Sequence, residues 1–193
     1  GVNLWCKNKE EAIKKYGHIS NWNTSLIEDM SRLFYNADLF NEDISDWDVS
    51  NVKNMSFMFY GCEKFNKPLN NWNVSNVTTM KGMFEFTKDF NQNINSWDLR
   101  NLEQILGMFR YSLSFNSPLD KWKFPKVYSL IDLFCGTQNF NQNINNWDIS
   151  NIKYLDLTFC NAKSFNQPLN NWDVSNVISI HATFAGTNFF NQP

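Results

Sequence analysis

The chain has 193 residues, a formal net charge of −2 and 42% hydrophobic residues. A near-neutral charge supplies no excess of cations for nucleic acid or anionic lipid, so we expect neither as a partner. No run approaches the ~18 apolar residues of a membrane-spanning helix, so we expect no direct membrane insertion.

The first seventeen residues do not share the pattern of the rest of the chain. Asn8 followed three positions later by Glu11 matches a capping box, and Gly17 is a typical helix stop. We therefore predict an N-terminal capping segment, residues 1–17, with one short amphipathic helix. It would cover the open end of the first repeat, assisted by Trp5.

From His18 onward the chain repeats every 25 residues, and the period is clearest in its tryptophans. These are Trp22, Trp47, Trp72, Trp97, Trp122, Trp147 and Trp172. A fixed period without insertions indicates a solenoid, so we assign residues 18–193 to one continuous repeat domain with architectural tryptophans. Pro193 stands partway into what would be an eighth unit, and we expect further repeats downstream.

Within each unit, apolar positions suggest two elements. Tryptophan and the residue two positions later alternate with polar residues, which predicts a half-buried strand. Further on, apolar residues recur at spacings of three to four, which favours a helix of one to two turns. The predicted fold class is therefore α/β: a solenoid of seven coils, each with a short parallel strand and a short helix.

Each unit returns through a phenylalanine followed by an asparagine, as in Phe65-Asn66 and Phe90-Asn91. An asparagine at one place in every coil predicts a ladder in which each amide bonds the next coil and satisfies the backbone of a tight bend.

The motifs WDVSNV, the MF pair and FNQPLNNW or FNQNINNW resemble the repeats of BspA-like surface proteins, relatives of leucine-rich-repeat proteins found in mycoplasmas, other bacteria, large DNA viruses and some protists. The resemblance implies a leucine-rich-repeat-like solenoid used for adhesion, for protein interaction or as a structural surface component. It favours a cell-surface or extracellular location, with a virion as the alternative, and implies no family-wide enzymatic activity. Residues 123–126 depart from the motif, so we expect a locally unusual fifth coil.

The outward positions beside the tryptophans predict an interaction surface, because a regular solenoid face is the default docking site. Its candidate residues are Asp46, Asp48, Asn73, Asp98, Lys121, Lys123, Asp148 and Asp173. We expect a protein or glycan to bind there through weak or multivalent contacts. Calcium binding by these oxygens is a sharper alternative, but hydrogen bonding to turns explains the row better and no DxDxDG loop is present.

A second candidate surface is an apolar patch at positions that are polar in the other units. It comprises Leu106, Tyr111, Leu113 and Ile131. If these side chains are exposed together they mark a partner site, and the alternative is local packing.

Enzymatic motifs are missing from the sequence. It contains no GxSxG, HExxH or P-loop pattern, and His18 and His181 stand at opposite ends of the repeats. We expect no catalytic residue, no metal site and no cofactor. A glycan-acting enzyme with paired carboxylates remains a remote alternative.

Two further expectations concern cysteines and assembly. Cys135 and Cys160 are one period apart, which leaves open either a bridge or two buried free thiols, and their small apolar positions favour thiols. An uncapped end invites end-to-end self-association, so a structural role in a virus particle or repeat assembly is a second functional hypothesis.

Overall fold

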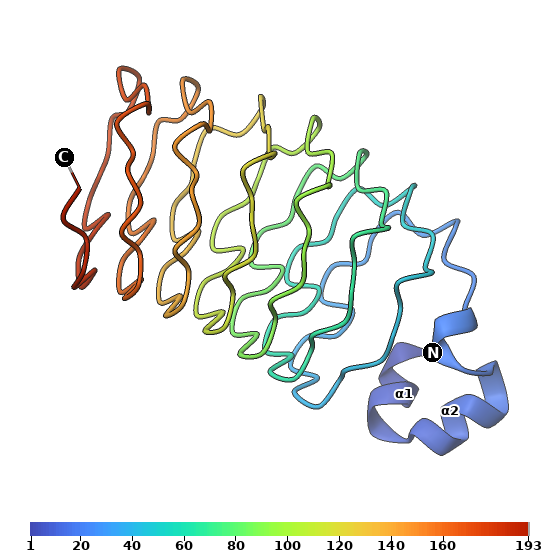
Figure 1. Ribbon diagram of the computed structural model, residues 1–193. Coiled ribbons are helices and arrows are strands. Elements are labelled where there is room, and N and C mark those ends of the chain that lie inside the picture. Colours follow the sequence, from blue (N-terminus) through green and yellow to red (C-terminus); the bar gives the residue numbers. More distant parts are fainter. Residues whose placement is uncertain (193) are drawn as a thin grey trace.

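The computed structural model describes residues 1–192. It is an elongated stack of coils with two helices at its N-terminal end and the two termini at opposite ends of the stack (Figure 1). We number the coils from residues 18–42 as coil 1, and each later coil follows by 25 residues. No helix among the described residues is long and apolar enough to cross a membrane.

The N-terminal cap consists of α1 (Val2–Lys7) and α2 (Lys9–Tyr16), followed by the short 3-10 helix η1 (Ile19–Asn21). The predicted capping box is confirmed: the Glu11 backbone N–H donates to Asn8 Oδ1 at 3.2 Å, and Asn8 Nδ2 donates to Glu11 Oε2 at 3.1 Å. α2 ends at Gly17 with a φ of 72°, as the stop predicted. The sequence did not indicate α1, which buries Trp5 against the first coil.

The predicted strand and helix of each coil are wrong. Among residues 1–192, helices occur only before Trp22, and neighbouring coils share isolated parallel bridges instead of strands. The α/β leucine-rich-repeat-like fold class is therefore replaced by a solenoid whose coils are built from successive turns. The bridges connect Asp29 to Asn54, Asn54 to Thr79, Thr79 to Gln104, Ser129 to Tyr154 and Tyr154 to Ser179.

The predicted helix is instead a turn segment, defined as the residues from eight to fifteen positions after each tryptophan, such as 80–87 in coil 3. Two residues in every turn segment have a positive φ, which a right-handed helix cannot contain. The first positive-φ column contains Arg32, Phe57, Gly82, Gly107, Asp132, Leu157 and Ala182. The second contains Asn36, Gly61, Phe86, Tyr111, Gly136, Asn161 and Gly186.

Backbone hydrogen bonds explain why these segments stack. In coil 3, the N–H groups of Gly82 and Phe84 donate to Leu106 and Met108 of the next coil, both at 2.9 Å. The alternate N–H groups bond within the coil, as from Glu85 to the Gly82 carbonyl at 3.1 Å. Along one turn segment the N–H groups therefore alternate between bonds that close a turn and bonds that join the next coil. The backbone hydrogen-bonding groups are thus satisfied without a helix or a sheet.

The stack is irregular at coil 5, where a locally unusual unit was predicted. No bridge joins Gln104 to Ser129 among the described residues, although the equivalent pairs of the other neighbouring coils are bridged. The Ser129 hydroxyl accepts from the Ile131 N–H at 3.4 Å, as the side chains of Asp29 and Asn54 accept from the residue two positions later in bridged coils. Residues 123–126, on which the expectation rested, take the same turn pattern as their counterparts, and the missing bridge lies beyond them at Ser129.

Side chains join the coils on the tryptophan side. The Trp97 indole Nε1–H donates to the Leu69 carbonyl of the preceding coil at 2.9 Å, and the same carbonyl accepts the Trp72 backbone N–H at 3.1 Å. The Asn101 amide likewise reaches back to the Ser75 carbonyl at 2.9 Å. The segment around each tryptophan, which was predicted to be a strand, is therefore a pair of turns. Its inward-facing residues alternate with polar ones because the chain bends.

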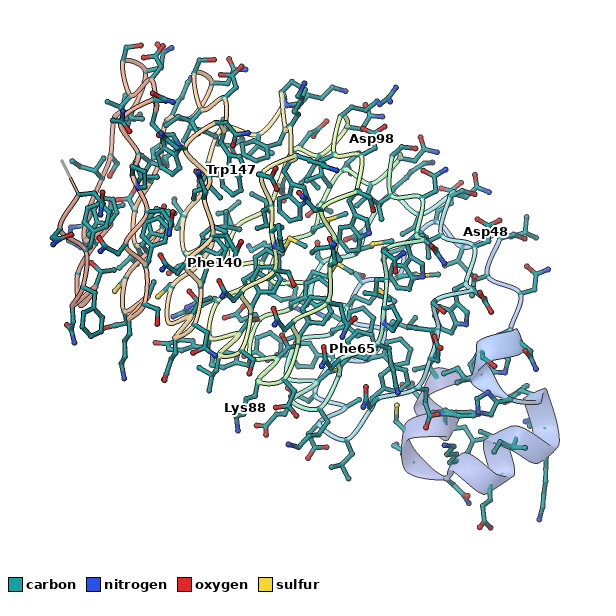
Figure 2. The ribbon with its side chains drawn as sticks, viewed as in Figure 1. Asp48, Phe65, Lys88, Asp98, Phe140 and Trp147 are labelled. Carbon is teal, nitrogen blue, oxygen red and sulfur yellow. The ribbon has the colours of Figure 1, made fainter. Side chains whose placement is uncertain are left out.

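The core consists of stacked aromatic columns. Phe84 lies on Phe109 at a ring-centroid distance of 5.9 Å, on Phe90 of its own coil at 4.0 Å, and 6.3 Å from Trp97. Equivalent rings continue through the stack, and Figure 2 shows Phe65, Phe140 and Trp147 inside it. Six of the seven repeat tryptophans are buried, whereas Trp22 is half-buried against the cap.

The predicted asparagine ladder is confirmed. The Oδ1 of Asn66 accepts the backbone N–H of Asn91 at 3.0 Å, and the Oδ1 of Asn91 accepts the backbone N–H of Asn116 at 2.8 Å. The bonds continue from Asn41 to Asn191. The ladder satisfies a backbone N–H of the return bend in coils 2–7.

Candidate functional site

The polar face is the surface formed by the predicted interaction row beside the tryptophans. Asp48 and Asp98 project from one edge of the stack, away from Lys88 (Figure 2). Each carboxylate or amide at the Asp48 column bonds within its own turn. Asp148 Oδ1, for example, accepts from the Ser150 N–H at 3.1 Å and from the Ser150 hydroxyl at 2.7 Å.

These bonds affect the ionisation of the row. The hydroxyl and then the backbone N–H of Ser150 hold the pKa of Asp148 below its usual range. The pKa values of Asp48, Asp98 and Asp173 are also lowered, chiefly by the side chain two residues later. Asn73 accepts in the same way from Ser75. The oxygens stabilise turns and do not converge on a common ligand.

The remaining polar-face candidates do not meet each other in ion pairs. Asp46, Lys121 and Lys123 are exposed, and none belongs to an ion pair among residues 1–192. The described residues also contain no group of three or more His, Cys, Asp or Glu side chains that could hold a metal ion. The interaction role of this row stays a prediction.

The four residues of the predicted apolar patch are all half-buried. They are Leu106, Tyr111, Leu113 and Ile131. Only Tyr111 has aromatic partners: its ring stacks on Phe86 at 5.1 Å and lies over Gly136. The patch of four stays a prediction, and Tyr111 belongs to a different cluster.

That cluster is an aromatic stripe on the outer side of the turn segments of coils 1–4. We call it the turn-face stripe, and it comprises Tyr35, Phe57, Tyr60, Phe86 and Tyr111. The Tyr35 and Tyr60 rings stack at 4.5 Å, and Phe86 meets Tyr60 edge-on at 5.3 Å. Tyr35 is 43% exposed and the other four are half-buried, so the stripe presents a continuous aromatic surface across four coils.

Backbone geometry positions the stripe. Phe57, Phe86 and Tyr111 have positive φ values, and the ring of Phe57 lies over Gly82 of the next coil. A Cβ atom at Gly82 would collide with that ring, so the glycine provides the space that Phe57 occupies. The surface aromatics are thus held by the same turns that join the coils.

Cations surround the stripe. The Arg32 guanidinium lies 5.6 Å from the ring centroids of both Tyr35 and Phe57, and the Lys81 ammonium lies 6.0 Å from Phe57. At the far end, Arg110 lies 5.4 Å from Tyr111. These distances are within the range of cation–π attraction.

A buried charge cluster lies beside the stripe. Glu85 is 8% exposed, and its Oε1 pairs with Arg110 Nη1 at 3.2 Å. Asp132 is the other carboxylate near this guanidinium, 3.8 Å from Arg110 Nε. Burial raises the pKa of Glu85, and the charge of Arg110 partly offsets this. The charge of Arg110 is therefore balanced by neighbouring carboxylates, whereas neither Arg32 nor Lys81 forms an ion pair among residues 1–192.

The cysteines do not add a reactive group to the stripe. All four are free, and Cys135 is buried. Burial and then the neighbouring Cys160 raise the pKa of Cys135 to about 12, so its thiol stays protonated at neutral pH. Of the two readings left open by the sequence, the structure shows free thiols.

One family model, described as "Mycoplasma protein of unknown function, DUF285", matches residues 6–122 and 103–193. The two matches cover nearly the whole chain. The chain belongs to the DUF285 family. No curated protein and no solved structure matches it.

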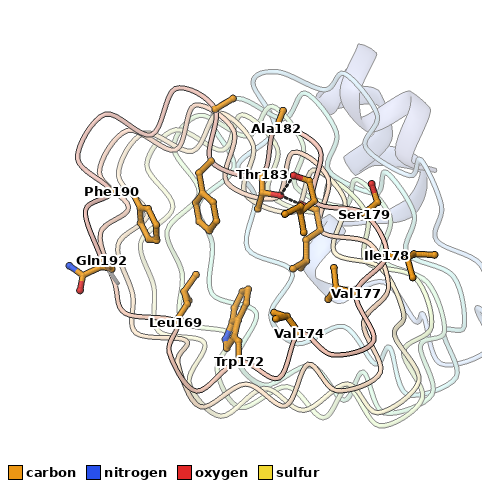
Figure 3. Close-up of a pocket in the computed structure, with 14 residues that line it drawn as sticks. Leu169, Trp172, Val174, Val177, Ile178, Ser179, Ala182, Thr183, Phe190 and Gln192 are labelled. Atoms are coloured by element: carbon orange, nitrogen blue, oxygen red, sulfur yellow. Dashed lines mark hydrogen bonds between the residues drawn. The ribbon is translucent and has the colours of Figure 1, made fainter.

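In this DUF285 chain a hollow of about 820 Å³ lies at the open side of coil 7 (Figure 3). Trp172 and Val174 lie on one side of it, opposite Ala182 and Thr183. Its apolar lining occupies columns that are buried in the preceding coils, as Ile180 is 66% exposed but its counterpart Leu155 only 4%. The hollow is the uncovered core of that coil and adds no separate site.

Sequence reasoning missed most of the turn-face stripe in this DUF285 protein. Only Tyr111 had been singled out, because the stripe occupies columns whose residue types vary from coil to coil. The signal was present: aromatics at Tyr35, Phe57, Tyr60 and Phe86 stand where most other coils have glycine, asparagine, cysteine, a charged residue or a small aliphatic one. Such departures from a template are visible only when each column is compared across all coils.

Proposed function

We propose that this DUF285 protein is a non-enzymatic repeat scaffold that binds another protein through the turn-face stripe. The observation that supports it is a row of partly exposed aromatic rings on a rigid stack. Aromatic and arginine side chains are the usual anchors of protein interfaces. The resemblance to BspA-like proteins favours the same role, in adhesion or interaction at a surface.

The stacking of the rings favours a protein over a glycan. Tyr35 and Tyr60 are nearly parallel, with an interplanar angle of 5°, and Phe86 and Tyr111 have an angle of 10°. Their faces therefore cover each other, and edges and hydroxyl groups are left to face a partner. A sugar ring that stacks on an aromatic side chain needs an open face, whereas protein groups can use edges and hydroxyl groups.

The support beneath the stripe lowers the cost of binding. The backbone N–H groups of Phe57 and Phe86 donate to carbonyls of the next coil at 2.8 and 2.9 Å. The aromatic residues of the stripe therefore cannot move apart without breaking hydrogen bonds between coils. Side chains that are already held lose little conformational entropy when a partner binds. A pre-organised aromatic surface of this kind suits a binding protein.

The test compares two tyrosine pairs. Tyr35→Ala/Tyr60→Ala removes the exposed end of the stripe, and Tyr128→Ala/Tyr154→Ala removes a second surface pair in neighbouring coils, 6.4 Å apart. Wild type and both variants are immobilised and exposed to proteins of the native surroundings and to a panel of glycans. Thermal unfolding checks that each variant is folded, and the single variant Tyr35→Ala serves if the double one is not.

We expect proteins that are retained by the wild type and the Tyr128/Tyr154 variant but lost from the Tyr35/Tyr60 variant. Retention of the same proteins by all three would contradict the assignment to the stripe. Retention of glycans alone would contradict the choice of a protein partner.

A further inference from the structure

We propose that the partner segment bound by the turn-face stripe is an acidic stretch of polypeptide. This inference rests on the proposed function and adds the chemistry of the ligand. It comes from Arg32 and Lys81, the two cations beside Phe57, neither of which forms an ion pair among residues 1–192.

Several cations near the turn segments have acidic partners. Lys53 pairs with Glu28 at 2.8 Å, and Arg110 pairs with Glu85 at 3.2 Å. Arg32 and Lys81 are both exposed, and neither belongs to an ion pair among residues 1–192. Within the turn segments of coils 1–3, Arg32 and Lys81 are the two cations, and the one carboxylate is the buried Glu85.

Phe57 brings these two charges together. The Arg32 guanidinium and the Lys81 ammonium lie 5.6 and 6.0 Å from the same ring centroid, so they are at most about 12 Å apart. An extended peptide advances ~3.3 Å per residue. Carboxylates about three or four residues apart can therefore reach both cations at once, while the chain between them crosses the edge of Phe57 and the tyrosines.

The charge pattern also sets a direction along the stripe. Beyond Lys81 the stripe continues past Arg110, which has two carboxylates beside it, Glu85 and Asp132, and so offers no free positive charge, to Tyr111. We infer that the acidic residues lie over coils 1–3 and that neutral or apolar residues lie over Phe86 and Tyr111. A positively charged partner segment would be repelled by Arg32 and Lys81.

The experiment measures binding of short fluorescein-labelled peptides by anisotropy at neutral pH. The acidic probe has glutamates about three residues apart, separated by leucine and proline. Its neutral twin has glutamine at those places, and a sulfated oligosaccharide of the same net charge represents the other anionic ligands. The proteins are the wild type, Arg32→Gln/Lys81→Gln, and the control Lys153→Gln/Lys163→Gln, which removes two other lysines.

We expect the acidic probe to bind the wild type and the control alike, and to bind Arg32→Gln/Lys81→Gln with a Kd about tenfold weaker, as for the loss of two exposed ion pairs. This difference should shrink as salt is raised. Equal binding of the neutral twin, equal binding by the two double variants, or no binding of the acidic probe would overturn the proposal. Tighter binding of the sulfated oligosaccharide would overturn the choice of a polypeptide.

The two proposals can fail separately. If Tyr35→Ala/Tyr60→Ala loses the natural partner while Arg32→Gln/Lys81→Gln keeps it, the stripe binds a protein that is not recognised by charge. If both variants keep the partner, the proposed function fails as well.

Discussion

The polar face and the turn face belong to the same coils but differ in how their side chains are used. On the polar face, Asp48 and Asp148 bond within their own turns, and Asn101 bonds the preceding coil. On the turn face of coils 1–3, Arg32 and Lys81 have no ion-pair partner within residues 1–192, and Tyr35 is partly exposed. The regular oxygens of the polar face therefore stabilise turns, whereas the turn face of coils 1–3 combines exposed cations with partly exposed aromatic rings.

This difference shows where specificity can reside in a repeat protein. A column that is the same in every coil is constrained by its neighbours above and below, because each member repeats one contact. A column that varies, such as the one containing Tyr60, Glu85 and Arg110, makes a different contact from coil to coil: Tyr60 stacks on Tyr35, whereas Glu85 pairs with Arg110. Binding surfaces are expected in columns of the second kind.

The largest expected effect concerns the tryptophan column beneath the polar face. Trp97→Ala removes a side chain that is 4% exposed and leaves the Leu69 carbonyl without its indole donor. We predict a loss of roughly 3–5 kcal/mol in the free energy of unfolding, measured by chemical denaturation.

The control is Tyr128→Ala, which truncates an aromatic that is 50% exposed. Its cost should be within about 0.5 kcal/mol. A loss below about 1 kcal/mol for Trp97→Ala would contradict the importance of the buried column.

The next effect separates backbone conformation from the packing of the stripe. Gly82 and Gly107 have φ values of 58° and 62°, but only at Gly82 would a Cβ meet the Phe57 ring. At Gly107 the nearest atoms are 3.9 Å away. We predict a cost of about 1–2 kcal/mol for Gly107→Ala and about 1 kcal/mol more for Gly82→Ala, by the same denaturation method.

Gly82→Ala should also displace Phe57 and weaken partner binding, whereas Gly107→Ala should not. Equal stability of the two variants would show that Phe57 does not pack on Gly82. Unchanged binding by a folded Gly82→Ala protein would show that the position of Phe57 is unimportant for the partner.

The smallest effect is on the polar face. Asp148→Ala should cost about 0.5–1 kcal/mol because it removes the acceptor for two hydrogen bonds from Ser150, and Asp148→Asn should cost less because the amide oxygen still accepts. The pKa of Asp148 is lowered on folding by these bonds, so its carboxylate stabilises the protein above its unfolded pKa of about 3.9.

That contribution is lost as the pH falls through the lower pKa of the folded state. Denaturation curves recorded from neutral pH downward should therefore show a steeper acid loss below about pH 4 for the wild type than for Asp148→Asn. Identical acid profiles would mean that the turn does not depend on the charge. A loss of partner binding by Asp148→Asn would place function on the polar face instead.

The sequence predicted the period, the cap and the asparagine ladder because each rests on a local pattern. The capping box at Asn8 and Glu11 needs only a few residues, and Asn66 and Asn91 are related by the period itself. The strand and helix were wrong because apolar spacings of three to four residues arise from successive turns as well as from a helix.

A sequence signal for those turns did exist. Glycine or asparagine occupies most of the second positive-φ column, including Asn36, Gly61 and Gly136, and these are the residues that most readily adopt left-handed conformations. The first positive-φ column also needs left-handed conformations, but the sequence does not indicate this because residues such as Arg32 and Phe57 occupy it. The stripe escaped notice for the same reason: it depends on where residues with a positive φ direct their side chains, which periodicity does not reveal.

The most direct test of the division between the two faces is oxidative footprinting of aromatic side chains, with and without a partner captured by the wild type. We predict that Tyr35 and Tyr60 are oxidised in the free protein and protected in the complex, while Tyr128 is oxidised equally in both. Protection of Tyr128 with no change at Tyr35 and Tyr60 would contradict the assignment of binding to the turn-face stripe.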